Sequence, residues 1–369
     1  MSLSKPVPTL SQMPWNVKQD IVNSANNGTK FSLRGCSKEF KTLVDSSTFH
    51  FNYLILNRNT DNSISLDLMV DYHIKRREVK FSAHPLGFMR QTWHMDVQLE
   101  KKVFVGPRNY TDAALAKFFK TIGNPKFNIF CLEITDKYSR KQCQSQRLSV
   151  LDKIQEFLGS LNRKLSVQAF AMSISNFQED ILKVLPYLEP GTLEMLTFYD
   201  EKTNRDRTTD EDLELVGELE QWKQANELTS YHCLNLPLEK WIHFSNCRIK
   251  LKGFTLGNVK QVIEAYSNNP NLHFHGCRVK QFRTRNRTEI RNFLSQFTVV
   301  LPNEEFKVPI ANSTDYIGVY VYPFDIVFVR CPENTPFPAK NSEQSDSSDD
   351  SDSSDEEESG DSDAEPQSE

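Results

Sequence analysis

Histidine and cysteine side chains gather in the second half of this 369-residue chain, and both types can bind zinc or act in nucleophilic catalysis. The ligand-type residues of this region are His232, Cys233, His243, Cys247, His273, His275 and Cys277. The cysteines form no C-x-x-C pair. The "HFHGC" stretch alternates like a strand, so His273 and His275 share a face by period alone. We therefore expect neither a metal ion nor a cofactor.

Motifs for catalysis are absent from the sequence. It contains no G-x-S-x-G, P-loop or H-E-x-x-H pattern, and no compact group of Cys, His and Asp suggests a nucleophile. We expect a protein that is not an enzyme.

Two basic stretches could hold anions. The first, "HIKRREVK", carries Lys75, Arg76, Arg77 and Lys80, and the second is "RVKQFRTRNRTEIR". The cations of the second stretch are Arg278, Lys280, Arg283, Arg285, Arg287 and Arg291. This second patch could bind phosphates or an acidic protein. Phe282 is its one aromatic residue, so a solvated or acidic-partner face is favoured over nucleic acid, which needs stacking rings.

The last 29 residues contain thirteen acidic and no basic residues, whereas the whole chain has a formal net charge of −5, so residues 1–340 carry +8. Residues 341–369 also lack core-forming side chains, which predicts a disordered tail. The serines with an acidic residue three positions on are phosphorylation candidates for acidophilic kinases; these are Ser347, Ser353, Ser354 and Ser362. The tail could keep the protein soluble, serve as a regulated docking segment, or cover the basic stretch 278–291.

Composition places the chain among globular proteins, with 38% hydrophobic residues. No apolar run approaches the roughly 20 residues that cross a bilayer, and the first residues do not resemble a signal peptide. The seven cysteines are scattered and odd in number, as in reduced proteins. We expect a protein of the cytosol, the nucleus or both, without membrane contact.

The N-terminal residues predict a small helical module. Pro14 can start a helix, and Val17, Ile21 and Ala25 recur along one helical face. A second helical pattern covers 31–45. A unit this small cannot bury all of its apolar side chains, so some must meet the rest of the chain or a partner.

An α+β protein is predicted from the remaining pattern. Alternating apolar residues over 49–105 indicate an antiparallel β meander. Beyond residue 110, strands alternate with helices, which favours a parallel sheet in an open α/β layer or a leucine-rich-repeat-like arc. The expected domains are a helical module at 1–48, a β meander at 49–110, an α/β domain at 111–300, a β extension at 301–340 and the tail at 341–369.

The stretch "ELEQWKQANEL" raises the question of why one tryptophan stands in a polar run. Leu215, Leu219 and Trp222 recur at i, i+4 and i+7, and Ala225 follows one turn later. They predict a helix face that packs into the core.

A family resemblance follows from this stretch and its neighbours. "LEPGTLEMLTFYD", "ELEQWKQANEL" and "HFSNCRIKLKGFTLGNVKQVIEAYSNNPNLHFHGC" resemble, in order and spacing, the FTH domain of a large nematode-type family of F-box proteins. The resemblance covers about 148–280. Its most specific part is Glu220, Gln221, Trp222, Lys223 and Ala225.

The N-terminus resembles a short F-box. Met13 and Pro14 stand at its L-P opening, and Leu33, Arg34, Cys36, Ser37 and Lys38 at its L-R-x-V-C-K-like signature. Asn16 replaces the usual acidic residue, and Gly35 stands where an apolar residue is common.

The two resemblances together imply a substrate-receptor subunit of an SCF-type ubiquitin ligase. The helical module would bind the Skp adaptor, and through it a cullin and a RING subunit, while the C-terminal domains would hold a protein target. The expected adaptor-binding residues are Met13, Pro14, Val17, Ile21, Phe31 and Leu33. Two alternatives are a non-catalytic scaffold with a degenerate F-box and, less favoured, a nucleic-acid-associated protein.

Overall fold

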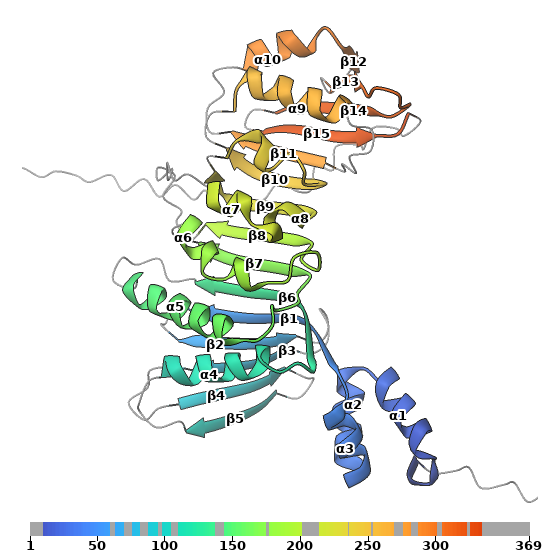
Figure 1. Ribbon diagram of the computed structural model, residues 1–369, viewed down its shortest axis with the longest axis vertical. Helices are drawn as coiled ribbons and strands as arrows, with labels where there is room; N and C mark the ends of the chain where they lie inside the picture. The colour runs from blue at the N-terminus through green and yellow to red at the C-terminus, as the bar shows by residue number, and fades with distance from the viewer. Residues whose placement is uncertain are drawn as a thin grey trace, which may run out of the picture. The chain divides into compact units, whose positions relative to one another are not determined.

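The computed structural model places a β-sheet and the helices that accompany it within Met1–Pro332 (Figure 1). It describes residues 10–59, 63–69, 76–81, 88–94, 98–104, 110–136, 144–174, 177–200, 214–234, 236–251, 254–268, 276–281, 287–300, 305–322 and 325–333. The acidic tail and its four candidate serines lie outside these residues. None of the helices within them combines the length and apolarity needed to cross a membrane.

Three short helices form the N-terminal module. After a 3-10 turn at Leu10–Gln12, these are α1 (Trp15–Ser24), α2 (Asn27–Cys36) and α3 (Lys38–Ser46). The Asn26 side chain accepts a hydrogen bond from the Thr29 N–H, and Ser37 accepts one from Phe40, so α2 and α3 begin at side-chain caps. Their shared core consists of Val22, Leu33, Phe40, Leu43 and Val44.

The next five strands form the antiparallel meander that the alternation predicted. They are β1 (Phe49–Arg58), β2 (Ile64–Met69), β3 (Arg76–Phe81), β4 (Phe88–His94) and β5 (Gln98–Phe104), each paired antiparallel with the next. Helix α4 (Tyr110–Ile122) then returns across β2 and β3.

Six parallel strands follow in sequence order. They are β6 (Phe127–Asp136), β7 (Ala169–Ile174), β8 (Met195–Asp200), β9 (Glu227–Leu234), β10 (Asn246–Leu251) and β11 (Gly276–Gln281). The connecting helices are α5 (Gln144–Ser160), α6 (Phe177–Leu182), α7 (Glu214–Glu218), α8 (Glu220–Gln224) and α9 (Leu256–Asn268), with 3-10 turns at Leu185–Tyr187 and Leu238–Lys240. This is the alternation of strands and helices that the sequence predicted.

A final antiparallel group completes the sheet. Helix α10 (Arg287–Leu294) precedes β12 (Thr298–Val300), β13 (Glu305–Pro309), β14 (Tyr316–Val321) and β15 (Asp325–Cys331). Strand β15 pairs antiparallel with β11, and β1 pairs in parallel with β6. The ranges 49–110, 111–300 and 301–340 thus all contribute to one continuous sheet, a connection that the strand patterns did not predict.

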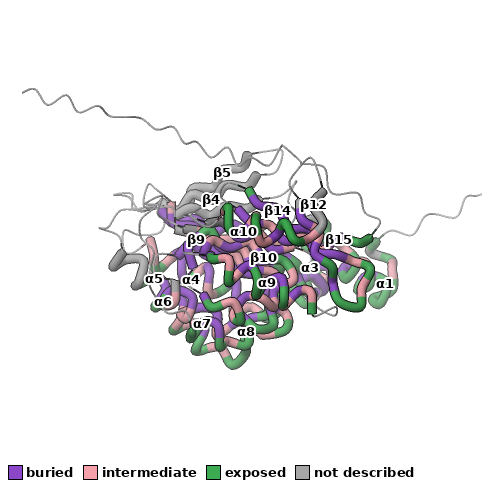
Figure 2. The backbone as a smooth tube through the Cα atoms, turned by 90° about the horizontal axis from the view of Figure 1, so that it is seen from above, coloured by how far each residue is buried: buried purple, intermediate pink, exposed green. Residues whose placement is uncertain are grey.

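The connecting helices cover one face of this sheet (Figures 1 and 2). Right-handed crossovers between successive parallel strands place every helix on the same side when the strand order never reverses. Strand β10 shows the result, because Cys247, Ile249 and Leu251 are buried under α9 whereas Arg248 and Lys250 are partly exposed. We call the side without these helices, over β8 to β11, the open face.

Trp222 is one of two fully buried tryptophans in the FTH-like range. Its ring stacks on Phe198 of β8 at 6.3 Å between centroids and meets Phe244 edge-on at 5.3 Å. The indole N–H donates to the carbonyl oxygen of Lys240 at 2.6 Å. The prediction that Trp222 and Ala225 belong to the core is confirmed, since both are buried.

Leu215 does not belong to this core, so that part of the prediction is wrong: 58% of the residue is exposed. The single predicted helix is two short ones, because Leu219 has extended backbone angles between α7 and α8. The break changes the rotation of the first segment, and Val216 takes the buried position instead. Leu219 is partly buried against the core.

The substitution Trp222→Phe tests this packing. It removes the indole N–H, leaves the Lys240 carbonyl without that donor and opens a small void, so the free energy of unfolding should fall by about 1–3 kcal/mol. Urea denaturation measures the change. The matched control is Trp15→Phe, at a half-exposed position, which should change stability by about 0.5 kcal/mol or less. Equal losses in the two variants would contradict the role of Trp222.

Candidate functional site

Three large apolar side chains are exposed at the start of the N-terminal module, in the 3-10 turn and the first turn of α1. Leu10, Trp15 and Val17 are 45%, 50% and 38% exposed. Trp15 and Val17 remain outside because the inner face of α1 is built from Val22 and the stem of Lys18, whose ammonium group reaches Glu39 at 2.6 Å. We call Leu10, Trp15 and Val17 the module surface. Three exposed large apolar side chains on so small a unit indicate a protein contact.

The residues expected to bind an adaptor occupy different environments. Pro14 and Val17 are exposed, and Met13 and Ile21 are half-buried. Leu33 is buried in the module core, and the side chain of Phe31 lies outside the described set. Trp15 was not among the expected residues, although it directly follows Pro14 and its ring is half exposed.

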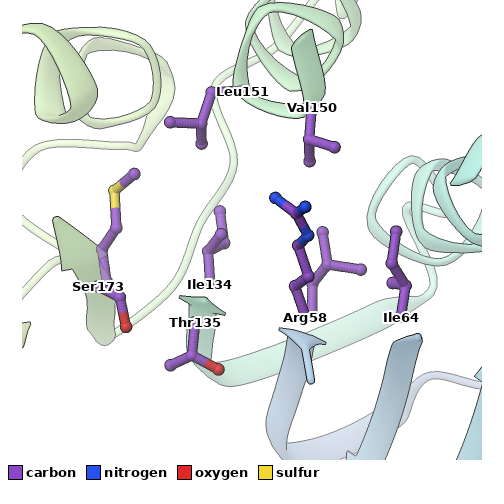
Figure 3. Close-up of a pocket in the computed structure, with 9 residues that line it drawn as sticks. Arg58, Ile64, Ile134, Thr135, Val150, Leu151 and Ser173 are labelled. Atoms are coloured by element: carbon purple, nitrogen blue, oxygen red, sulfur yellow. The ribbon is translucent and has the colours of Figure 1, made fainter. Parts of the chain in front are cut away.

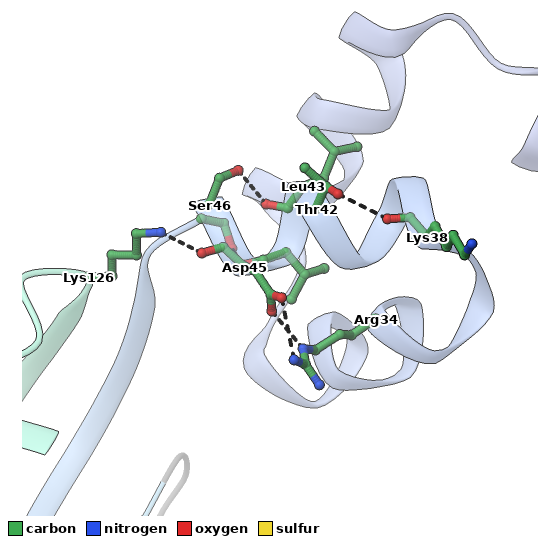
Figure 4. Close-up of polar contacts among 9 residues, drawn as sticks. Arg34, Lys38, Thr42, Leu43, Asp45, Ser46 and Lys126 are labelled. Atoms are coloured by element: carbon green, nitrogen blue, oxygen red, sulfur yellow. Dashed lines mark hydrogen bonds and ion pairs between the residues drawn. The ribbon is translucent and has the colours of Figure 1, made fainter. Parts of the chain in front are cut away.

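Polar contacts tie the module to the sheet. The Asn27 amide donates to the His50 carbonyl and accepts from the His50 N–H at 3.3 Å, which imitates a backbone pair. Lys30 donates to the carbonyl of Thr48 at 2.6 Å, and Lys126 to that of Asp45 at 2.6 Å (Figure 4). The joint between α3 and β1 is therefore held from both α2 and the start of β6.

Arg34 and Asp45 form a surface ion pair beside this joint, with Nε and Oδ1 2.6 Å apart (Figure 4). The hydrogen bond that Arg34 donates to Asp45 lowers the pKa of the Asp45 carboxyl. The same hydrogen bond raises the pKa of the Arg34 guanidinium. Both side chains are nearly half exposed, so the pair adds little to stability. Arg34 belongs to the F-box-like signature, and its observed role is to link α2 to α3.

The open face presents aromatic and cationic side chains. Tyr199 of β8 stacks on Tyr231 of β9, with ring centroids 5.8 Å apart and planes within 17°. The guanidinium of Arg248 lies over the Tyr231 ring at 5.7 Å, and Tyr231 is 41% exposed. Tyrosine and arginine are the residue types that carry most binding energy at protein interfaces.

The pairing register between β9 and β10 changes at the position of Tyr231, which is exposed. Arg248 pairs with Thr229, but Lys250 pairs with Cys233, so β9 carries extra residues opposite Ile249. Such bulges redirect side chains and are frequent at functional sites. The bulge places Tyr231 between the two cations of β10.

The predicted basic patch is divided between two faces, so its description as one patch is wrong. Arg278 and Lys280 are in β11, and the exposed Arg278 side chain marks the open face. Arg287 and Arg291 are in α10, which packs beside α9 on the covered face. Arg283 and Arg285 lie outside the described residues. Arg248 and Lys250, which join Arg278, were missed, although the alternation in "CRIKL" could have indicated them.

The cysteines and histidines of the described residues show no arrangement around a metal position. Within the described ranges, no group of three or more His, Cys, Asp or Glu side chains could hold a metal ion. Cys247 and Cys277 are neighbours across β10 and β11 on the covered face, and burial raises the pKa of the Cys247 thiol. A thiol kept protonated in this way is a core residue rather than a thiolate ligand. His273 and His275 lie outside the described ranges.

A small cavity lies under α5, lined by Leu56, Arg58, Ile64, Ile134, Thr135, Val150, Leu151, Met172 and Ser173 (Figure 3). Its volume of about 30 Å³ suits a water molecule and not a metabolite. The Arg58 side chain points toward Val150, so the cavity is part of the helix-to-sheet packing.

The most specific FTH-like residues form a polar clamp above Trp222. The Gln221 amide donates to the carbonyl groups of Pro186 and Leu188 at 3.1 and 2.7 Å. Glu218 accepts from Lys223 at 2.9 Å and also from Lys240. These bonds lower the pKa of Glu218 to about 2, with Lys240 as the larger cause. The clamp joins α7 and α8 to the turns before β8 and β10.

Comparison with known protein families identifies the FTH domain. The model of the FTH domain matches residues 148–297, from α5 to just beyond α10, which extends the expected range of about 148–280. A comparison with curated proteins gives no match, and a comparison with solved structures gives none. The chain therefore contains an FTH domain, built from β7 to β11 and the helices that cover them.

We expect the stabilising effect of the polar clamp to be lost at acid pH, as Glu218 becomes protonated. Because the pKa of Glu218 in the folded chain lies below its ordinary 4.5, its stabilising effect is complete above about pH 4.5 and is lost as pH falls toward 2. Carbon-detected NMR titration of the Glu218 carboxyl measures the value. Lys240→Gln should raise this pKa more than Lys223→Gln does, and the reverse order would contradict the assignment.

Proposed function

We propose that this protein is a substrate receptor of an SCF-type ubiquitin ligase. The observation that carries the proposal is the presence in one chain of an FTH domain, a family associated with F-box proteins, and of an N-terminal three-helix module with exposed apolar residues. The F-box-like residues at Met13, Pro14 and Leu33 to Lys38 support the same assignment.

In this proposal the module surface binds the Skp adaptor. Trp15 and Val17 would enter the interface, whereas Leu33 would support it from the module core. The adaptor would connect the chain to a cullin and a RING subunit. The receptor performs no bond chemistry, because ubiquitin transfer is accelerated by holding the target close to the charged conjugating enzyme. Such a receptor would work in the cytosol, the nucleus or both.

The target would bind the open face in this proposal. Sequential parallel strands with helices on one side are typical of leucine-rich-repeat arcs, which bind partners on the side without helices. The exposed Tyr231 and the partly exposed Arg248 and Arg278 supply anchors of the kind found at such interfaces.

Val17→Asp tests the adaptor contact. The residue is exposed, so the change should leave the fold intact while it introduces a charge into an apolar interface. We expect a loss of about 2 kcal/mol or more of binding free energy, roughly a 30-fold weaker complex. Co-expression with the Skp adaptor, followed by size-exclusion chromatography and titration calorimetry, measures this.

Asn23→Asp is the matched control, because it adds the same charge to an exposed position of α1 about 9 Å further along the helix axis than Val17, and further still from Trp15. It should bind like the wild type. If the wild type forms no complex with the adaptor, the receptor proposal fails and a scaffold with a degenerate F-box takes its place. Equal weakening in both variants would exclude Val17 as an anchor.

A further inference from the structure

Four exposed cations lie where β6 and β7 begin, at the edge of the sheet that we call the rim. Lys126 directly precedes β6, and Lys120 lies in the last turn of α4. Arg163 and Lys164 follow the end of α5. The Arg163 guanidinium donates to the Ile122 carbonyl at 3.3 Å, which brings this segment to the end of α4. We call Lys120, Lys126, Arg163 and Lys164 the rim cations.

The positive charge of the rim cations exceeds the negative charge around them. Lys120 and Lys164 make no ion pair with a described residue. Arg163 and Lys126 donate to backbone carbonyls, which carry no net charge, and the carboxylate of Asp45 near Lys126 is already hydrogen-bonded to Arg34. The ends of α4 and α5 supply about half a negative charge each, far less than four cations need. An acidic partner can therefore match this group.

The segment that leads to the acidic tail leaves the sheet at the same rim. Strand β15 runs antiparallel to β11, and Val329 near its end pairs with Gly276 at the start of β11. The strand order from β15 to β7 passes β11, β10, β9 and β8. These are five spacings of about 4.8 Å, or roughly 24 Å in all.

The length of the chain beyond β15 suits this span. Seventeen residues separate Glu333, the last described residue, from Asp350 in the densest acidic stretch. An unstructured chain of that length has a root-mean-square span of about 23 Å. Intramolecular binding is strongest when this span equals the distance between the sites. Glu194 and Glu227, at the starts of β8 and β9, repel an acidic segment from the part of the rim in between.

We propose that the acidic tail, residues 341–369, binds the rim cations of its own chain. Carboxylates of the tail pair with the ammonium groups of Lys120 and Lys164 and with the guanidinium of Arg163. Salt weakens this contact, and phosphorylation of serines in the tail strengthens it, because each phosphate adds a charge of about −1.5 to −2. Neither the adaptor nor a target takes part, so the contact is independent of the proposed function.

Carbodiimide cross-linking of the full chain tests the contact, because the reagent joins a carboxylate directly to an adjacent amine. Mass spectrometry of proteolytic fragments should show the tail linked to Lys120, Lys126 and Lys164 about fivefold or more over Lys260. Lys260 is the internal comparison, since it is exposed and lies on α9, nearer in the strand order to the start of the tail. The excess should disappear at about 1 M salt, where screening acts beyond about 3 Å.

Two results of this experiment would overturn the proposal. Equal linking of Lys260 and the rim lysines would mean that the tail has no preferred site. Links mainly between different copies of the chain, detected in a mixture of isotopically light and heavy protein, would mean that the tail binds another molecule.

A double variant tests the charge of the rim. Lys120→Gln combined with Lys164→Gln should reduce the links at the remaining Lys126 by about threefold or more, because the tail loses two of its four cations. The matched control is Lys153→Gln combined with Lys223→Gln, which removes the same charge from exposed lysines already held in ion pairs. It should leave the links unchanged. Thermal melting verifies that each variant is folded. An equal decline in both double variants, or no link from the tail to any rim lysine of the wild type, would contradict the assignment.

Discussion

The one-directional order of the parallel strands is the constraint on which this structure depends. From β6 to β11 each strand joins the same side of its predecessor, so right-handed crossovers bring all the connecting helices to one face. Most parallel sheets are covered on both faces. Here the helices bury the aliphatic side of β10, and the opposite side carries residues that tolerate water, such as Arg248 and Tyr231. The surface available to a partner is therefore a direct result of the strand order.

The clamp around Trp222 shows how a short crossover can stabilise such a layer. In its described part, 214–226, the connection between β8 and β9 contains two helices of five residues each, too short to be stable alone. Trp222 compensates with ring contacts from β8 and from the turn before β10, and Gln221 adds two hydrogen bonds to the turn before β8. The crossover between β8 and β9 thus contacts β8, the turn before it and the turn before β10. These contacts explain why the polar stretch contains Trp222.

Local periodicity predicted the elements well, because alternation and helical spacing depend on neighbouring residues. The antiparallel meander and the strand-helix alternation both followed from it, and so did the burial of Trp222. Contacts between distant segments were not predictable in this way. The pairing of β1 with β6 depends on the return of α4 across the meander, and the exposure of Leu215 depends on a backbone break at Leu219. The local alternation could have indicated Arg248, but not its pairing with Arg278, which lies thirty positions further along the chain.

Among the residues that the structure describes, fifteen strands form one sheet, and its outer strands are β12 and β5. An unpaired edge can recruit strands from other molecules, and it is a common starting point for aggregation. Strand β12 has three residues, too few to template a long pairing, and β5 carries Glu100, Lys101 and Lys102 in succession. Both ends of the sheet thus have features that discourage intermolecular growth, and the joining of separate strand groups into a single layer removes the further edges that two smaller sheets would expose.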